Sequence, residues 1–136
     1  MSLVTWFRRT AFPETSPRLE NLVRRVSDYL DSKPRVDEFT PKIIAAALEE
    51  SELAVITALA ILENRGIAKR HFGVYCANSG IPLESYDDPS QIEESWGCDV
   101  CGKTHEMSTW GDCKVELYFT VDRNNLTRFI AGASAA

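Results

Sequence analysis

The chain has 136 residues, 44% of them hydrophobic, and a formal net charge of −5. This length predicts one domain, and no apolar run approaches the ~20 residues that a membrane-spanning helix needs. The first twelve residues contain two arginines and lack the long apolar segment of a secretory signal, so we expect a cytoplasmic protein with no membrane partner.

Charge is distributed unevenly along the chain. Residues 1–35 carry seven Lys or Arg against four Asp or Glu, whereas residues 36–136 carry eight against sixteen. An acidic body disfavours contact with a phosphate backbone. We therefore expect a protein partner or a homo-oligomer rather than nucleic acid.

Residues 1–15 are predicted to form an apolar N-terminal arm that packs back on the domain or, as the alternative, docks on a partner. Ser16 and Pro17 are typical of a helix start, with the serine as N-cap and the proline in the first turn. The apolar residues that follow have the spacing of one buried helix face: Leu19, Leu22, Val23, Val26, Tyr29 and Leu30.

Two shorter helices are predicted next. One begins at Thr40-Pro41, and the other runs from Glu52 to about Asn64, with Gly66 suited to its C-terminal end. The apolar face of the first is expected to hold Ile43, Ile44, Ala47 and Leu48. Two short helices joined by a tight turn, after a longer first helix, resemble a helix-turn-helix.

The pattern becomes strand-like after Gly66. Residues 67–75 are expected to be extended, residues 81–96 to form a polar loop, and residues 114–121 to form a second strand. The buried face of that second strand is predicted from its alternation to hold Val115, Leu117, Phe119 and Val121. We expect the two strands to pair antiparallel as a wing, followed by a short helix capped by Asp122.

All four cysteines lie within residues 76–113. Cys98-Asp-Val-Cys101-Gly has the spacing of a zinc knuckle, in which both thiolates face one ion and the glycine takes a positive φ. Cys76-Ala-Asn-Ser79-Gly has the same shape, with serine in place of the second cysteine. We expect a structural Zn²⁺ with four ligands: Cys76, Cys98, Cys101 and His105.

Alternatives to this ligand set stay open. Cys113 begins the returning strand and is the second candidate for the fourth ligand, and the site could also have lost its metal. A redox pair at Cys98 and Cys101 is disfavoured because no helix starts there. The histidines have no partner at the spacing of a catalytic triad, and no phosphate-binding loop is present, so we expect no enzymatic activity.

The elements together predict an α+β fold, a winged helix with a zinc-ribbon-like insertion at the tip of the wing. The expected parts are an arm at residues 1–15, a winged-helix domain at 16–121 with the insertion at 76–113, and a short helix and tail at 122–136.

The second helix of the predicted helix-turn-helix carries few side chains that read DNA. It offers Thr57, Asn64 and one terminal arginine, and is otherwise mostly apolar. The candidates for a nucleic-acid patch lie elsewhere: Lys69, Arg70, Arg24 and Arg25. The first hypothesis is a protein-interaction or regulatory module; the alternatives are a DNA-binding transcriptional regulator and a structural domain whose neighbour does the chemistry.

Three phrases carry a resemblance to a known group, namely residues 62–67 (L-E-N-R-G-I), 74–76 (V-Y-C) and 98–105 (C-D-V-C-G-K-T-H). They resemble the winged-helix/zinc-ribbon module of bacterial conflict and phage-defence loci, and more weakly the alpha subunit of archaeal transcription factor E. The first resemblance implies an accessory subunit beside effector proteins in a prokaryotic defence system. Ser79 departs from the pattern, because a full ribbon has cysteine there.

Overall fold

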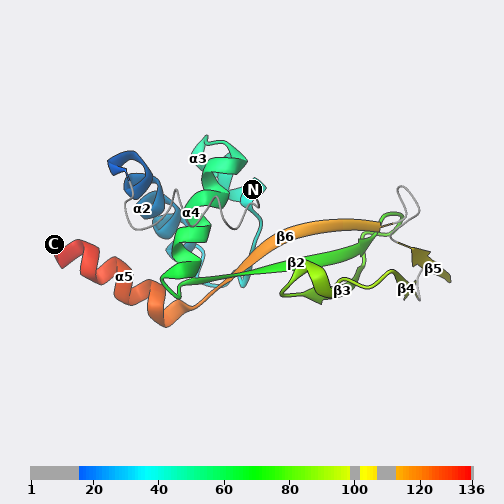
Figure 1. Cartoon of the computed structure of the whole chain (residues 1–136). Coiled ribbons are helices and arrows are strands. Elements are labelled where there is room, and N and C mark those ends of the chain that lie inside the picture. Colours follow the sequence, from blue (N-terminus) through cyan, green and yellow to red (C-terminus); the bar gives the residue numbers. More distant parts are fainter. Residues whose placement is uncertain (1–15, 99–101, 107–112, 136) are drawn as a thin grey trace. The chain divides into compact units, whose positions relative to one another are not determined.

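The structure is a computed structural model that describes residues 16–98, 102–106 and 113–135 (Figure 1). The chain divides into two compact units. Residues 1–69 together with 119–136 form one, which we call the helical unit, and residues 70–118 form the other, the ribbon unit. The predicted N-terminal arm, residues 1–15, lies outside the described residues.

The architecture is mixed α+β, with helices and antiparallel strands, as the sequence predicted. One sheet has the strand order β1-β6-β2-β3, and the other pairs β4 with β5. The bounds in chain order are α2 Pro17–Asp31, β1 Glu38–Phe39, α3 Pro41–Leu48, α4 Glu52–Asn64, β2 Ala68–Cys76, β3 Pro82–Tyr86, the 3₁₀ turn η1 Pro89–Gln91, β4 Ser95–Cys98, β5 Lys103–Glu106, β6 Cys113–Val121 and α5 Arg123–Ala135.

Hydroxyl side chains fix the starts of α2, α3 and α4, as predicted for the first two of these. The backbone N–H of Leu19 donates to Ser16 Oγ over 3.1 Å, and that of Ile43 donates to Thr40 Oγ1 over 3.3 Å. Ser51 caps α4 in the same way. Each cap satisfies a backbone donor that the first helical turn leaves without an intrahelical acceptor.

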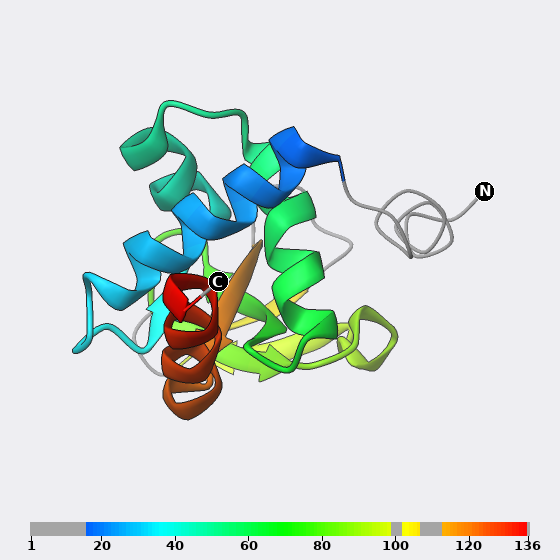
Figure 2. The same ribbon diagram turned by 90° about the vertical axis from the view of Figure 1, so that its left-hand side faces the viewer.

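The helical unit is built around an apolar core. Helix α2 packs against α3, α4 and α5, and α3 packs against α4 (Figure 2). Helix α4 is buried on more than one side, as its nearly uniform apolar composition predicted. The fully or almost fully buried side chains of this core include Val23, Val26, Leu30, Ile44, Val55, Leu59, Ile61, Leu62, Phe119 and Leu126.

Helix α3 turns a different face to the core than the sequence predicted. Ile44 and Ala45 are buried, whereas Ile43 is 57% exposed and Ala47 is exposed. Two adjacent isoleucines are compatible with either of two helix faces, and the packing against α2 and α4 selects Ile44. The apolar face predicted for this helix was therefore partly wrong.

The predicted loop at residues 81–96 was also wrong, because it contains β3 and the start of β4. Strand β3 pairs antiparallel with β2, with Phe72 opposite Tyr86 and Val74 opposite Glu84. Polar and acidic residues dominate this stretch, so the apolar alternation that marks a half-buried strand is absent from it.

Strand β6 lies next to β2 in the sheet order, as expected for the two wing strands, but the buried face of β6 differs from the prediction. Val115 is 43% exposed, whereas Tyr118 is buried. The Tyr118 ring stacks on His71 with centroids 5.1 Å apart, and its hydroxyl is hydrogen-bonded to Ser85 Oγ. These polar contacts account for a tyrosine buried on the face that the alternation had assigned to the surface.

Helix α5 begins after Asp122, which accepts from the backbone N–H of Asn125 as predicted, and it continues to Ala135 through residues expected to form a tail. Arg123, at its start, donates to the carbonyl oxygens of Leu30 and Lys33 over 2.8 Å each, and to that of Val36. These bonds occupy carbonyls at and just beyond the C-terminal end of α2. None of the helices in the described residues has the length and hydrophobicity needed to cross a membrane.

Candidate metal centre

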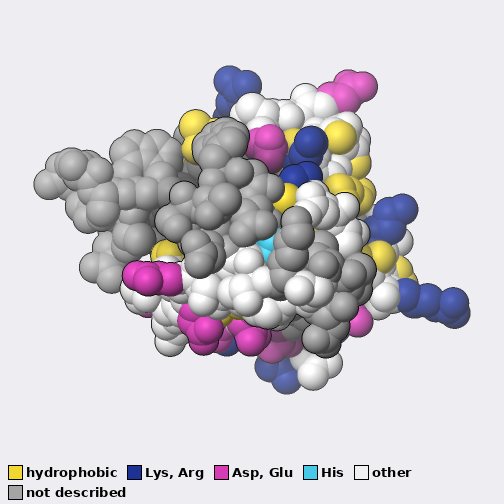
Figure 3. All heavy atoms as spheres, turned by 90° about the vertical axis from the view of Figure 1, so that its right-hand side faces the viewer, with side chains coloured by type: hydrophobic (Ala, Val, Ile, Leu, Met, Phe, Trp, Pro, Cys, Tyr) yellow, Lys and Arg dark blue, Asp and Glu magenta, His cyan; other side chains and the backbone are white. Residues whose placement is uncertain are grey.

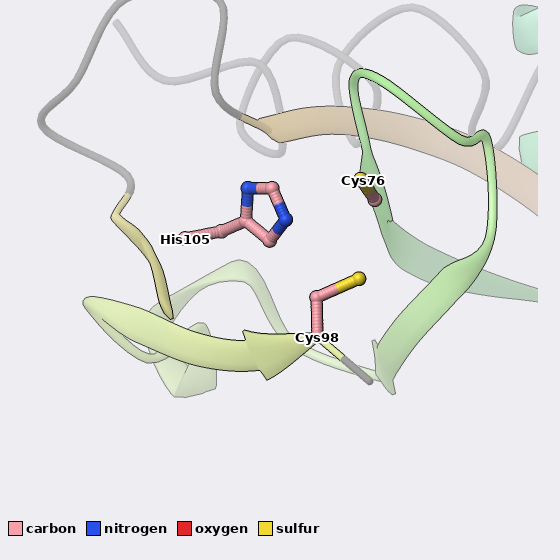
Figure 4. Close-up of side chains that lie close together, drawn as sticks. All are labelled: Cys76, Cys98 and His105. Atoms are coloured by element: carbon pink, nitrogen blue, oxygen red, sulfur yellow. The ribbon is translucent and has the colours of Figure 1, made fainter. Parts of the chain in front are cut away.

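Three buried side chains of the ribbon unit bring metal-ligand atoms together. Cys76, Cys98 and His105 come from the ends of β2 and β4 and from β5, and their side chains converge on one space (Figure 4). Each offers one ligand atom, and these atoms all lie within 4.8 Å of one another. Cys76 and His105 are 0% exposed and Cys98 is 6% exposed.

The β4–β5 hairpin explains why two of these side chains share a face. Trp96 lies opposite His105 in the antiparallel register, and Cys98 is two residues along the strand from Trp96. Side chains two residues apart on a strand point to the same side, as do directly opposed cross-strand neighbours. The buried face of the hairpin therefore contains Trp96, Cys98 and His105, while Ser95, Gly97 and Thr104 are exposed.

Trp96 closes one side of this face. Its indole Nε1–H donates to the Tyr86 hydroxyl over 2.9 Å, so its polar atom is satisfied while the ring is buried. Trp96 stands two residues before Cys98, beside the second cysteine turn. Its burial is that of a covering residue.

The two cysteine turns have matching backbone geometry. In the first, the N–H of Gly80 donates to the carbonyl of Cys76 over 2.8 Å, and Gly80 has φ +73°. In the second, the N–H of Gly102 donates to the carbonyl of Cys98 over 2.9 Å, and Gly102 has φ +69°. A residue with a Cβ rarely adopts this left-handed conformation, which is why glycine follows each turn.

The backbone of the first turn also contacts its sulfur atom. The N–H of Ser79 donates to Sγ of Cys76 over 3.4 Å. A hydrogen bond to sulfur stabilises the thiolate, which is the form that binds a metal ion. Sequence reasoning noted Ser79 as a missing ligand and did not anticipate this role of its backbone.

The donor set fits a zinc ion. A tetrahedral ion with Zn–S bonds of about 2.3 Å holds its ligand atoms nearly 4 Å apart, so the present separations need only a small contraction. Two thiols and an imidazole are soft and borderline donors that zinc prefers over oxygen ligands. The cluster is therefore close enough and of the right chemistry to hold a metal ion.

Cys101, one of the four predicted ligands, lies outside the described residues. Cys76, Cys98 and Cys113 are thiols rather than disulfides, and Cys113 is half-buried. Cys113 is not part of the group of ligand atoms found among the described residues. Of His105 and Cys113, the two candidates for the fourth ligand, it is therefore His105 whose ligand atom lies close to those of Cys76 and Cys98.

The four cations predicted as a nucleic-acid patch differ in exposure and in hydrogen bonding. Arg25 donates to Glu50 Oε1 over 2.8 Å and to the carbonyl of Leu48 over 2.7 Å, so its guanidinium ties α2 to the end of α3. Arg24 and Lys69 are exposed, and Arg70 is half-buried. At α4, the hydroxyl of the buried Thr57 donates to the Leu53 carbonyl.

The ribbon unit has an acidic surface. Residues 71–102 contain no Lys or Arg, and acidic side chains gather on the face drawn in Figure 3. One of its acids, Asp88, has a pKa below the usual range. The backbone N–H of Ser90, and then its side chain, lower this pKa by hydrogen-bonding the carboxylate. The charge of Arg70 lowers the pKa by a smaller amount, and desolvation opposes the shift. This surface repels phosphate groups. Among the described residues of this stretch, the exposed acids are Glu84, Asp87, Asp88, Glu93 and Glu94.

No family model matches the chain, and neither a curated protein nor a solved structure does so. The interpretation of the site therefore depends on its own geometry. Buried donors on three separate segments are typical of a metal centre that joins those segments, whereas a catalytic metal keeps a position open to water and substrate.

Proposed function

We propose that Cys76, Cys98 and His105 bind a structural zinc ion, and that the chain is a non-enzymatic protein-interaction or regulatory module. The observation that carries this proposal is the convergence of three buried donors from three segments of the ribbon unit. Their burial supports a structural role, because substrate and water need an accessible metal. Zinc bound here would hold the end of β2 to the β4–β5 hairpin.

Cys101 is the fourth ligand in this proposal. It occupies the same position in the second turn that Ser79 occupies in the first. The matched bonds from Gly80 and Gly102 support two turns of one kind, and a turn of that kind presents both of its cysteines to one ion. The resulting set of three thiolates and one imidazole is a common structural zinc set.

The order of the helices and strands supports the winged-helix part of the proposal. Helix α2, the short strand β1, the helices α3 and α4 and the strands β2 and β6 follow one another in the chain order of a winged helix, and the sheet order β1-β6-β2 agrees with it. The proposed zinc ligands lie between the last residue of β2 and the start of β6 in sequence, where a wing has its tip. Membership of a defence or regulatory system stays a prediction from the sequence resemblance.

Protein is favoured over DNA as the partner. The helix that reads DNA in a helix-turn-helix would be α4, and its exposed residues include Glu52, Leu53 and Asn64. Its terminal Arg65 is already paired, donating to Glu20 over 2.6 Å. With one exposed amide and one guanidinium that is already paired, this surface offers few groups for phosphates or base edges.

Metal analysis of the purified full-length chain tests the zinc proposal. We expect one zinc per chain in the wild type and in the matched control Cys113→Ser, and loss of zinc in Cys98→Ser and His105→Ala. Cobalt(II) substitution gives a second readout, because its visible spectrum reports tetrahedral thiolate ligation. A wild-type chain without metal, or a His105→Ala chain with undiminished affinity, would contradict the proposed site.

A further inference from the structure

Helix α3 and the start of α4 expose apolar side chains that the core leaves out. Ile43 is 57% exposed and Leu53 is 60% exposed, which makes them the most exposed large hydrophobic residues in the described part of the chain. Scattered exposed hydrophobic residues need no explanation, but these two lie on helices that pack against each other. Ala46 and Ala47, also exposed, extend the apolar surface along α3.

Charged residues lie at opposite ends of this surface. Lys42 is exposed in the first turn of α3, and Glu49 is exposed directly after its last residue. The two are separated by about 10 Å along the helix axis, at a rise of about 1.5 Å per residue. The neighbouring Glu50 is not counted with these two charges, because it already forms an ion pair with Arg25 of the same chain.

This arrangement is complementary to itself. If two copies of α3 pack antiparallel about a two-fold axis, Lys42 of each copy faces Glu49 of the other, and the apolar surface lies between the two ion pairs. The side chains of Ala46 and Ala47 are short enough to let the helix axes approach to the lower end of the usual 8–10 Å range. A partner of uniform charge would repel one end of this surface.

We infer that the exposed face of α3, with Leu53 at the start of α4, is a homodimer interface whose occupant is the same face of a second copy of this chain. The inference names a partner for the interaction role proposed above and rests on that role. It does not require the metal centre, because every residue of the face belongs to the helical unit.

The dimer is expected to be weak. One face of a helix of about two turns buries well under the roughly 1,200–2,000 Å² of total area that standard stable interfaces bury. Apolar contacts at the centre then supply most of the affinity, and the ion pairs at the rim set orientation. We therefore expect a dissociation constant on the order of 100 µM.

Sedimentation equilibrium of the zinc-loaded full-length chain, from about 10 µM to about 1 mM, tests the inference. Ile43→Asp is expected to weaken the dimer more than about tenfold, because it puts an unpaired charge at the centre of the interface. Val115→Asp is the matched control, since Val115 is exposed in the ribbon unit and its substitution should leave the dissociation constant unchanged.

A charge exchange makes the test specific for a second copy. Lys42→Glu and Glu49→Lys should each weaken self-association by about tenfold, because like charges then meet at both ends. A mixture of the two variants should form a heterodimer of about wild-type affinity, because both ion pairs are restored, one with its original polarity and one with reversed polarity. Circular dichroism and zinc content on the same samples confirm that each variant is folded.

Three results would overturn the inference: a wild-type chain that is monomeric throughout this concentration range, a dimer unaffected by Ile43→Asp in a folded chain, or variants that do not pair with each other. A zinc-binding monomer would overturn the dimer and leave the metal proposal standing. A dimer that contains no metal and responds to the charge exchange as expected would overturn the metal proposal and leave the dimer inference standing.

Discussion

The helical unit and the ribbon unit are stabilised in different ways. The helical unit has a continuous apolar core contributed by α2, α3, α4 and α5, with residues of β1 and β6. The buried hydrophobic residues described for the ribbon unit are Val74, Cys76, Trp96, Cys98 and Tyr118, two of which are candidate metal ligands. Units of this size with so few buried apolar side chains usually need a metal or disulfides to fold.

The difference suggests that the two units respond to different perturbations. Loss of metal should affect the ribbon unit and leave the helical unit folded, whereas a cavity in the apolar core should do the opposite.

Metal removal should have the largest effect. A chelator, or Cys98→Ser, is expected to unfold the β4–β5 hairpin, because structural zinc contributes on the order of 10 kcal/mol to folding of its site. Hydrogen exchange should show fast amides in β4 and β5 and unchanged protection in α2 and α4. Equal loss of protection in both units would mean that they fold as one.

A cavity in the helical core should give the converse result. Leu62→Ala removes a fully buried side chain from α4 and is expected to cost about 2–5 kcal/mol of the helical unit's unfolding free energy. Zinc stoichiometry should be unchanged. The control Leu53→Ala changes a side chain that is 60% exposed on the same helix and should cost less than about 1 kcal/mol.

The difference between the two cysteine turns can be tested by supplying the absent thiol. His105→Ala should weaken zinc binding by about 100-fold, which corresponds to roughly 3 kcal/mol. Adding Ser79→Cys should recover most of that loss, because a second knuckle thiolate then replaces the imidazole. Competition with a chromophoric chelator measures both affinities, and a double variant no better than His105→Ala would argue that Ser79 points away from the ion.

A smaller effect is expected from the glycine that ends the first turn. Gly80→Ala should weaken zinc binding about fivefold, since a φ of +73° costs alanine about 1 kcal/mol although no atom lies within 4 Å of the added carbon. Gly97→Ala is the matched control, because its surroundings are equally open and its φ is ordinary. Equal losses in the two variants would show that the backbone angle is not the cause.

The elements that the sequence predicted well are those with a local signal. The caps at Ser16 and Thr40 identified the helix starts, and the knuckle spacing predicted Cys98 as a ligand, which the structure places close to Cys76 and His105. His105 was found because its offset from Cys101 is typical of a knuckle histidine. In each case the information lies within about five residues of chain.

The elements that were missed depend on contacts between distant segments. Nothing in the polar sequence of β3 indicates a strand, because its pairing is decided by β2. The burial of Tyr118 depends on His71 and Ser85, which lie on other strands. The choice between Ile43 and Ile44 was made by the packing of α3 on its neighbours, which a 3.6-residue period alone does not resolve.

The helical unit is discontinuous in sequence, and this sets an order of events during translation. Phe119, Arg123 and Leu126 complete its core and the end of α2, yet the ribosome makes them after all of residues 70–118. Every proposed zinc ligand is therefore synthesised before the last parts of the helical core. The nascent chain can load its metal while α2 still lacks the arginine that bonds the carbonyls at its end.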